Sequence, residues 1–147
     1  MSRIAVIRLK GKFSVSPSVD LTLRSLRLDR LYACVLLPEG ENAKGMIQAC
    51  KDLVSYGEAS KETISLLLER RGKTTDGKKL SAAKKPEEIG KLAAEIASSP
   101  KKLAELGVAP VFFLSPPKGG FGSRKAHVPF GPVGKNPQIN DLISRMA

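Results

Sequence analysis

The sequence predicts an α+β fold built on a β-α-β-α-β unit over residues 1–58. Three observations support this: short apolar runs of strand type recur, the segments between them have helical apolar spacing, and cap or turn residues mark the boundaries. Two helices that cross between three strands lie on one face of the sheet if the crossovers are right-handed and the strand order is split. We therefore expect a three-stranded sheet with two helices on one face and the other face open to a partner.

The first strand is expected at residues 4–9, an apolar and β-branched run that is typical of a central strand. Ser16 and Pro17 then predict a helix start, because a hydroxyl can cap a free N–H group and proline suits the first helical position. The apolar spacing ends this helix near Leu28. A second strand is expected at residues 32–37, which repeat the pattern of the first.

Asn42 is the expected cap of the second helix, whose apolar residues follow a spacing of three and four. Gly45 lies inside this helix, at a cost of about 1 kcal/mol relative to alanine. That cost indicates either tight packing of the helix on the sheet or close contact with a ligand. Residues 54–57 are the expected third strand.

Residues 59–114 are expected to form a helical extension that returns to the core. A helix at 62–71, with Ser60 as its cap, should pack against the edge of the core. Pro86 opens a further helix, and a shorter one follows it. The apolar run at 111–114 predicts a strand that pairs with an edge of the main sheet.

Residues 115–147 are expected to be a basic tail that ends in a helix. The part up to Asn136 has no hydrophobic periodicity, four prolines, and four cations without an acid, so alone it should be disordered. Asn136 and Pro137 predict the terminal helix, which has a narrow apolar stripe that must dock. Three rings of the tail either stack on splayed bases or anchor it to the protein: Phe121, His127 and Phe130.

Several function classes are disfavoured by composition. The chain has no Trp and few other aromatic residues, so it offers no ladder of rings for stacking successive bases. Cys34 and Cys50 fall on apolar positions and His127 is the single histidine, which leaves no ligand set for a metal. No apolar run approaches the roughly 20 residues that span a bilayer, and no signal peptide is present. We expect an intracellular protein without membrane, cofactor or small-molecule substrate.

The formal net charge of +11 predicts a polyanionic partner. Residues 1–31 carry seven cations against two acids, whereas residues 39–69 carry three cations against six acids. Positive charge therefore gathers on the first strand, the loop after it and the first helix, where we expect a phosphate backbone to bind. The alternative is an ordinary solvated surface.

Residues 70–85 form a second basic segment, with seven cations against one acid. Gly72, Lys73 and Thr74 have the order that ends a nucleotide-binding P-loop. The glycine that this motif requires five positions earlier is replaced by Leu67, inside a predicted helix, so no phosphate cradle is expected. The segment is either a solvated linker or a phosphate contact.

Five segments together resemble a known family, the universal large-subunit ribosomal protein called L-thirty in bacteria and archaea and L-seven in eukaryotes. They lie in the expected order and span nearly the whole chain: residues 26–31, 44–47, 54–58, 114–121 and 139–146. The last two segments resemble a C-terminal extension that the short bacterial forms lack. Because a long basic N-terminal arm is absent, the archaeal branch fits best.

The resemblance implies a ferredoxin-like core that binds ribosomal RNA in the large subunit of the cytoplasmic ribosome, without a catalytic residue or cofactor. Its partners would be large-subunit ribosomal RNA, a set that can include the small 5S rRNA, and neighbouring large-subunit proteins. The resemblance and the charge pattern together indicate candidate RNA contacts. These are Arg8, Lys10, Lys12, Ser14, Arg24, Arg27, Arg30, Lys44, Arg70, Arg71, Lys118, Arg124, Lys125 and His127. Recognition would depend chiefly on RNA shape.

Two rival functions remain open. An acylphosphatase-like hydrolase on the same fold would need an arginine in its anion-binding loop, and residues 11–16 contain none. An assembly factor that acts transiently on pre-ribosomal RNA would share almost every feature described above. The two ribosomal alternatives differ in whether the protein stays on mature subunits.

Overall fold

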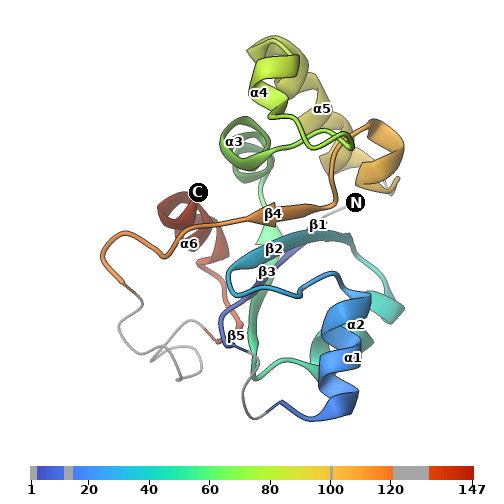
Figure 1. The fold of residues 1–147 in the computed structure, drawn as a ribbon, viewed down its shortest axis with the longest axis vertical. Coiled ribbons are helices and arrows are strands. Elements are labelled where there is room, and N and C mark those ends of the chain that lie inside the picture. The colour runs from blue at the N-terminus through green and yellow to red at the C-terminus, as the bar shows by residue number, and fades with distance from the viewer. Residues whose placement is uncertain (1–2, 12–14, 100, 121–132) are drawn as a thin grey trace.

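The computed structural model describes residues 3–11, 15–99, 101–120 and 133–147. Its centre is a five-stranded sheet with the strand order β4-β2-β1-β3-β5. β1 is antiparallel to both β2 and β3, β4 is antiparallel to β2, and β5 is parallel to β3. The strands are β1 (Arg3–Arg8), β2 (Ala33–Pro38), β3 (Val54–Ala59), β4 (Val111–Phe113) and β5 (Gly134–Lys135) (Figure 1).

The expected β-α-β-α-β unit is confirmed, and edge strands extend its three-stranded sheet on both sides. Helices cover both faces of the sheet: α1 and α2 lie on one side, and the helices of the C-terminal half lie on the other (Figure 1). The helices are α1 (Pro17–Ser25), α2 (Glu41–Ala49), α3 (Lys61–Arg71), α4 (Leu80–Ala83), α5 (Pro86–Ser98), the 3₁₀ helix η1 (Leu103–Leu106) and α6 (Ile139–Met146).

β1 is the central strand and divides the interior into two clusters. All six of its residues are buried. Successive side chains of a strand point to opposite faces, so Ile4 and Val6 pack with the residues of α1 and α2, such as Ile47. Ala5 and Ile7 pack in the second cluster, which includes residues of α3, α5, β4 and α6. An apolar run without alternation is therefore the pattern of a strand that is covered on both faces.

The expectation of an open sheet face is wrong. The chain covers this face with its own extension, because α3 buries Ile64, Leu67 and Leu68 against it and α6 adds Leu142 and Ile143. α3 thus lies on the face of the sheet and not at its edge. The prediction failed because the apolar faces of the later helices must be buried, and they pack against this face of the sheet.

Three local predictions for α1 and α2 also need correction. α1 ends at Ser25, earlier than Leu28, because Arg27 adopts a left-handed φ of 63°. The cap of α2 is Gly40 and not Asn42. Gly45 is exposed, and a Cβ atom added there would meet nothing within 4 Å. Tight packing therefore does not explain this glycine, and contact with a ligand stays a prediction.

The helical extension follows the predicted pattern with one added helix, α4. The Ser60 hydroxyl accepts a hydrogen bond of 3.2 Å from the Thr63 N–H group and caps α3, as expected. α5 begins at Pro86, as expected. The basic segment 70–85 contains the short α4, and the shorter predicted helix is the 3₁₀ turn η1, which closes at Gly107 with a φ of 77°.

The C-terminal segment docks on the core, as its apolar stripe required. α6 buries four residues, and β5 adds a parallel edge to β3 that the sequence pattern did not predict. Gly57 allows this close approach, since a Cβ atom there would lie 2.5 Å from the Asn136 carbonyl oxygen and 2.8 Å from Ile139 Cγ2.

Candidate nucleic-acid interface

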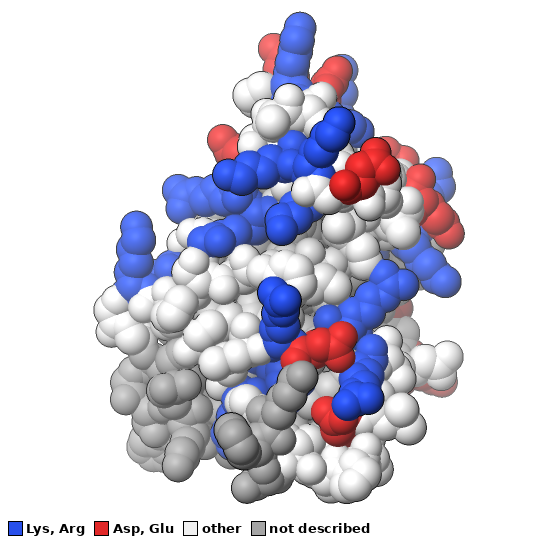
Figure 2. Space-filling view, in the orientation of Figure 1, with Lys and Arg blue, Asp and Glu red and all other residues white. Residues whose placement is uncertain are grey.

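Cations gather where two loops meet β4. One loop joins α1 to β2 and carries Arg27 and Arg30, and the other joins α3 to α4 and carries Lys73. Figure 2 shows Lys and Arg side chains in a band across the upper part of this face, over α3 and the chain that follows it. Sequence analysis treated these two basic segments separately, and the fold places them on one surface.

The prediction that Arg8 contacts RNA is wrong. Its side chain is 1% exposed, its Nε donates to the Lys10 carbonyl at 2.9 Å, and its Nη1 donates to the Leu28 carbonyl at 2.6 Å. A buried guanidinium that is engaged in this way cannot reach a phosphate at the surface. Arg8 instead braces the start of the loop after β1 and the α1–β2 loop, so it positions other candidates.

Two other candidates are exposed but form ion pairs within the protein. Arg24 pairs with Asp20 at 3.1 Å on α1, and Lys44 pairs with Glu39 at 3.1 Å at the start of α2. Exposed pairs of this kind contribute about 0–1 kcal/mol. Both cations therefore remain available to a stronger anionic partner.

The α1–β2 loop presents Arg27 and Arg30 to solvent. Its shape is unusual, because Arg27 and Tyr32 both have left-handed φ values, of 63° and 64°. Few residues other than glycine adopt this conformation. The Leu28 N–H group donates to the Leu23 carbonyl at 2.8 Å, and the Tyr32 N–H group donates to the Arg8 carbonyl at 2.8 Å. The backbone therefore fixes both ends of the loop.

The candidate cations at the end of α3 and the start of the tail differ in exposure and in their hydrogen bonds to the protein. Arg70 is exposed, whereas Arg71 is half-buried and its Nη2 donates to the Ser115 hydroxyl. Lys118 is exposed, and its N–H group donates to the Arg145 carbonyl at 3.2 Å. The Arg145 guanidinium donates to the Gly120 carbonyl at 3.1 Å, so α6 tethers the beginning of the tail.

Lys10 is half-buried beside the loop after β1. The remaining candidates and the ring residues Phe121 and Phe130 lie outside the described residues, so their roles stay predictions. These candidates are Lys12, Ser14, Arg124, Lys125 and His127.

Phe113 of this surface was not predicted as a contact, and Lys73 was predicted only as part of the basic segment 70–85, with a phosphate contact as one alternative. The Arg30 Cζ atom lies 5.2 Å from the centroid of the Phe113 ring, and the Lys73 Nζ atom lies 5.8 Å from it. Strand alternation was the available signal, because adjacent Phe112 and Phe113 must face opposite sides of the sheet. The sequence alone could not show that one side is uncovered at this position.

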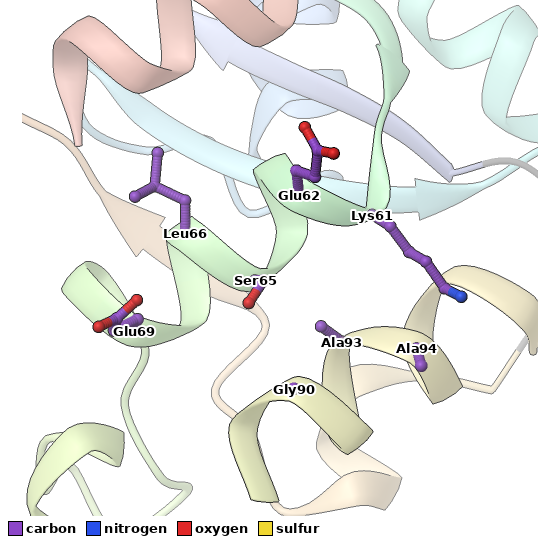
Figure 3. A pocket seen from close by; sticks show the side chains of 8 residues that line it. All are labelled: Lys61, Glu62, Ser65, Leu66, Glu69, Gly90, Ala93 and Ala94. Atoms are coloured by element: carbon purple, nitrogen blue, oxygen red, sulfur yellow. The ribbon is translucent and has the colours of Figure 1, made fainter. Parts of the chain in front are cut away.

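A shallow groove lies between α3 and α5. Ser65 of α3 lies opposite Gly90 and Ala93 of α5 across the groove (Figure 3). A Cβ atom added at Gly90 would meet nothing within 4 Å, so the groove is open at this glycine. Glu62 and Leu66 point away from the groove (Figure 3). Its side chains therefore form no convergent set of charged groups.

In the described ranges, no helix is long and apolar enough to cross a membrane. No group of three His, Cys, Asp or Glu side chains able to hold a metal ion occurs among the same residues. Cys34 and Cys50 are both buried as free thiols, as their apolar positions predicted.

Comparison with known proteins places these features in a family. The family model described as ribosomal protein L30p/L7e matches residues 4–54. The large ribosomal subunit protein uL30 of Archaeoglobus fulgidus is 38% identical, covering 97% of this chain and 98% of that protein. Those of Methanothrix thermoacetophila and Staphylothermus marinus are 35% and 37% identical, each covering 97% of this chain, and 98% and 96% of their own lengths. The chain therefore belongs to the L30p/L7e family of ribosomal proteins.

Proposed function

We propose that this protein is a structural component of the large ribosomal subunit and binds ribosomal RNA through its basic surface and C-terminal tail. The archaeal relatives, which match it over nearly their full length, are named as large-subunit proteins. The observation that carries the RNA contact is the convergence of Arg30 and Lys73 on one exposed surface. Neither cation forms an ion pair with an acid in the described part of the chain, so both are available to an external anion.

The proposed contacts use phosphates and riboses more than base edges. Lysine and arginine side chains neutralise phosphate charge and release counterions, which supplies affinity without sequence preference. A rigid surface that displays such charges at fixed positions recognises the shape of folded RNA. The proposed contact residues are Lys10, Lys12, Ser14, Arg24, Arg27, Arg30, Lys44, Arg70, Arg71, Lys118, Arg124, Lys125 and His127.

The proposed partners are large-subunit ribosomal RNA and neighbouring large-subunit proteins in the cytoplasmic ribosome, and 5S rRNA belongs to this set if its position on the subunit allows contact. We assign the protein no catalytic step and no cofactor. Its contribution is to hold folded RNA segments in a fixed arrangement by charge and shape.

Sedimentation of a salt-washed cell extract tests the proposed function. The protein should remain with mature large subunits at one copy through about 0.5 M salt, where nonspecific electrostatic binding is strongly weakened. Mass spectrometry across the gradient gives the copy number. Migration with precursor particles alone would favour the assembly factor, and migration at the top of the gradient at every salt concentration would overturn the RNA proposal.

A triple variant tests the placement of the basic surface. Replacement of Lys10, Lys12 and Arg30 by Ala should weaken binding to large-subunit rRNA and reduce its logarithmic salt slope by about 2 to 3. The matched control replaces three cations outside the candidate set, Lys51, Lys61 and Lys91, and should leave the slope nearly unchanged. Equal slopes for the two triple variants would refute this placement.

A further inference from the structure

We propose that Phe113, Arg30 and Lys73 form a dock for one unpaired nucleotide of ribosomal RNA. A base stacks on the flat surface offered by the Phe113 ring and the Arg30 guanidinium, and the flanking phosphates pair with the two cations. This inference rests on the proposed function, because it specifies which form of RNA this part of the surface binds.

The position of Phe113 in the sheet explains why its ring is partly exposed. β4 is an edge strand, and Phe113 lies opposite the small Ala33 of β2. Phe112 points into the core on the α3 side and is fully buried, so Phe113 points to the α1–α2 side. In the described part of the chain, α1 and α2 cover that face, and at β4 they leave the ring 41% exposed. The exposed part of the ring lies beside the Arg30 and Lys73 side chains.

Among the ion pairs of the described residues, none includes Arg30 or Lys73. Both distances are measured to the same ring centroid, so the Arg30 and Lys73 charges are within about 11 Å of each other. Exposed charges within this distance repel each other at low ionic strength, and added salt screens the repulsion. Attraction to the ring offsets part of this repulsion, and an anion placed beside both cations would remove the rest.

Backbone contacts hold both arms of the dock in place. Arg30 lies in the loop that Arg8 braces through the Leu28 carbonyl. The backbone of Lys73 forms an isolated antiparallel β-bridge with that of Lys79. The Lys73 carbonyl also accepts a 2.8 Å hydrogen bond from the Ala109 N–H group, just before β4. The dock is therefore organised before RNA binds, which lowers the entropic cost of binding.

The geometry favours an unpaired nucleotide over the other anionic partners. An RNA duplex presents phosphates but keeps its base faces stacked inside, so it would leave the ring without a contact. An acidic protein segment would use the two charges but has no need of a flat aromatic surface. Unpaired bases stack on aromatic rings and on arginine guanidinium planes, and the neighbouring phosphates supply the negative charge. A single ring suits a single nucleotide, in agreement with the absence of a ladder of rings.

Binding of short RNA strands to the full chain tests the dock. The probe is a single-stranded uridine 12-mer with a fluorescent label, and a second 12-mer has the same phosphates but no bases. Phe113→Ala and Phe113→Leu should each weaken binding of the uridine strand by about fivefold or more and leave binding of the abasic strand unchanged. Phe113→Leu keeps an apolar side chain, so it separates stacking from simple burial.

Substitution of a cation should change the salt dependence of binding in the same titrations. Lys73→Ala should reduce the logarithmic salt slope for either strand by about 0.7, whereas Phe113→Ala should leave the slope unchanged. Lys91→Ala, on the exposed side of α5, is the matched control and should change neither affinity nor slope. Circular dichroism of each variant verifies that it is folded.

The outcomes separate the dock from the proposed function. Equal weakening of both strands by Phe113→Ala would mean that the ring only positions the cations, and no weakening of either would mean that it does not contact RNA; both results overturn the dock. A preference of the surface for an acidic peptide over the uridine strand would also overturn it. If any of these occurs while the protein stays on mature subunits in salt, the dock fails and the proposed function stands.

Discussion

Arg3 and Arg8 fix the two ends of β1 by donating to carbonyl groups of distant segments. The Arg3 Nε donates to the Ile96 carbonyl at 2.8 Å, at the end of α5, and burial lowers the pKa of this guanidinium. Arg8 performs the same task for the loops around it. These two arginines therefore stabilise the fold, whereas Arg30 stays at the surface. The same side chain serves packing or binding according to where the backbone carries it.

Replacement of Arg8 by Met should lower the free energy of unfolding by about 2–4 kcal/mol, because the Lys10 and Leu28 carbonyls would lose their donors. Urea unfolding followed by circular dichroism measures this change. Lys10→Ala is the control and should change stability by no more than about 0.5 kcal/mol, although it should weaken RNA binding. Equal stability of the Arg8→Met variant and the wild type would contradict the bracing role.

We expect the buried thiol of Cys34 to lower the free energy of unfolding at high pH. Complete burial raises the pKa of its thiol from 9.0 to about 12. Between these values the unfolded chain releases the proton and the folded chain keeps it, so ionisation favours unfolding. The contribution of the buried neutral thiol to the free energy of unfolding is fully present below pH 9 and is lost as the pH rises toward 12. Urea unfolding from neutral pH to about 11 should show a smaller decline for Cys34→Ala than for the wild type. Parallel declines would exclude this role of Cys34.

Helix boundaries in this protein depend on local capping, and their positions in space depend on contacts between elements. Ser60 caps α3 through its own hydroxyl, a signal that is visible in the sequence. Asn140 of α6 strengthens the same cap from a distance, since its Oδ1 accepts from the Ser60 N–H group at 3.0 Å and from the Thr63 hydroxyl at 2.8 Å. Its Nδ2 donates to the Glu58 carbonyl at 3.2 Å. One amide thus joins β3, α3 and α6.

Asn140→Ala should therefore lower the free energy of unfolding by about 1–3 kcal/mol. Combined with Ser60→Ala in a double-mutant cycle, it should show a coupling of at least about 0.5 kcal/mol, because both side chains bond to the same turn. Asn42→Ala is the matched control on α2 and should change stability by less than about 0.5 kcal/mol. A cost for Asn42→Ala as large as that for Asn140→Ala would contradict the assignment of Gly40 as the cap of α2.

In the described part of the chain, two apolar clusters lie on either side of the central strand β1. The cluster on the α3 side takes residues from the N-terminal unit, the helical extension and the C-terminal segment, for example Ile7, Leu67 and Ile143. α6 therefore contributes to the core, although most of the segment before it is basic and rich in glycine and proline. We expect the three sequence-defined segments to unfold together.

Ile143→Ala should lower the free energy of unfolding of the whole protein by about 2–5 kcal/mol, because Ile143 is fully buried. Tyrosine fluorescence and far-ultraviolet circular dichroism should give coincident transitions. Leu21→Ala, at a residue that is 66% exposed, is the control and should shift stability by no more than about 0.5 kcal/mol. An unchanged midpoint for Ile143→Ala, with loss of α6 alone, would contradict a shared core.

Residues close together along the chain predict the first three strands, the main helices, the cap at Ser60 and the start of α5 at Pro86. The excess of positive charge follows from composition. Even the coverage of both sheet faces had a signal, in the unbroken apolar run of β1. The tertiary structure alone decided which arginines are buried, that β5 pairs with β3, and that Arg30 and Lys73 meet at Phe113. These features join residues far apart in the sequence, and their contacts exist only when the packing of helices on both faces has fixed where each loop lies.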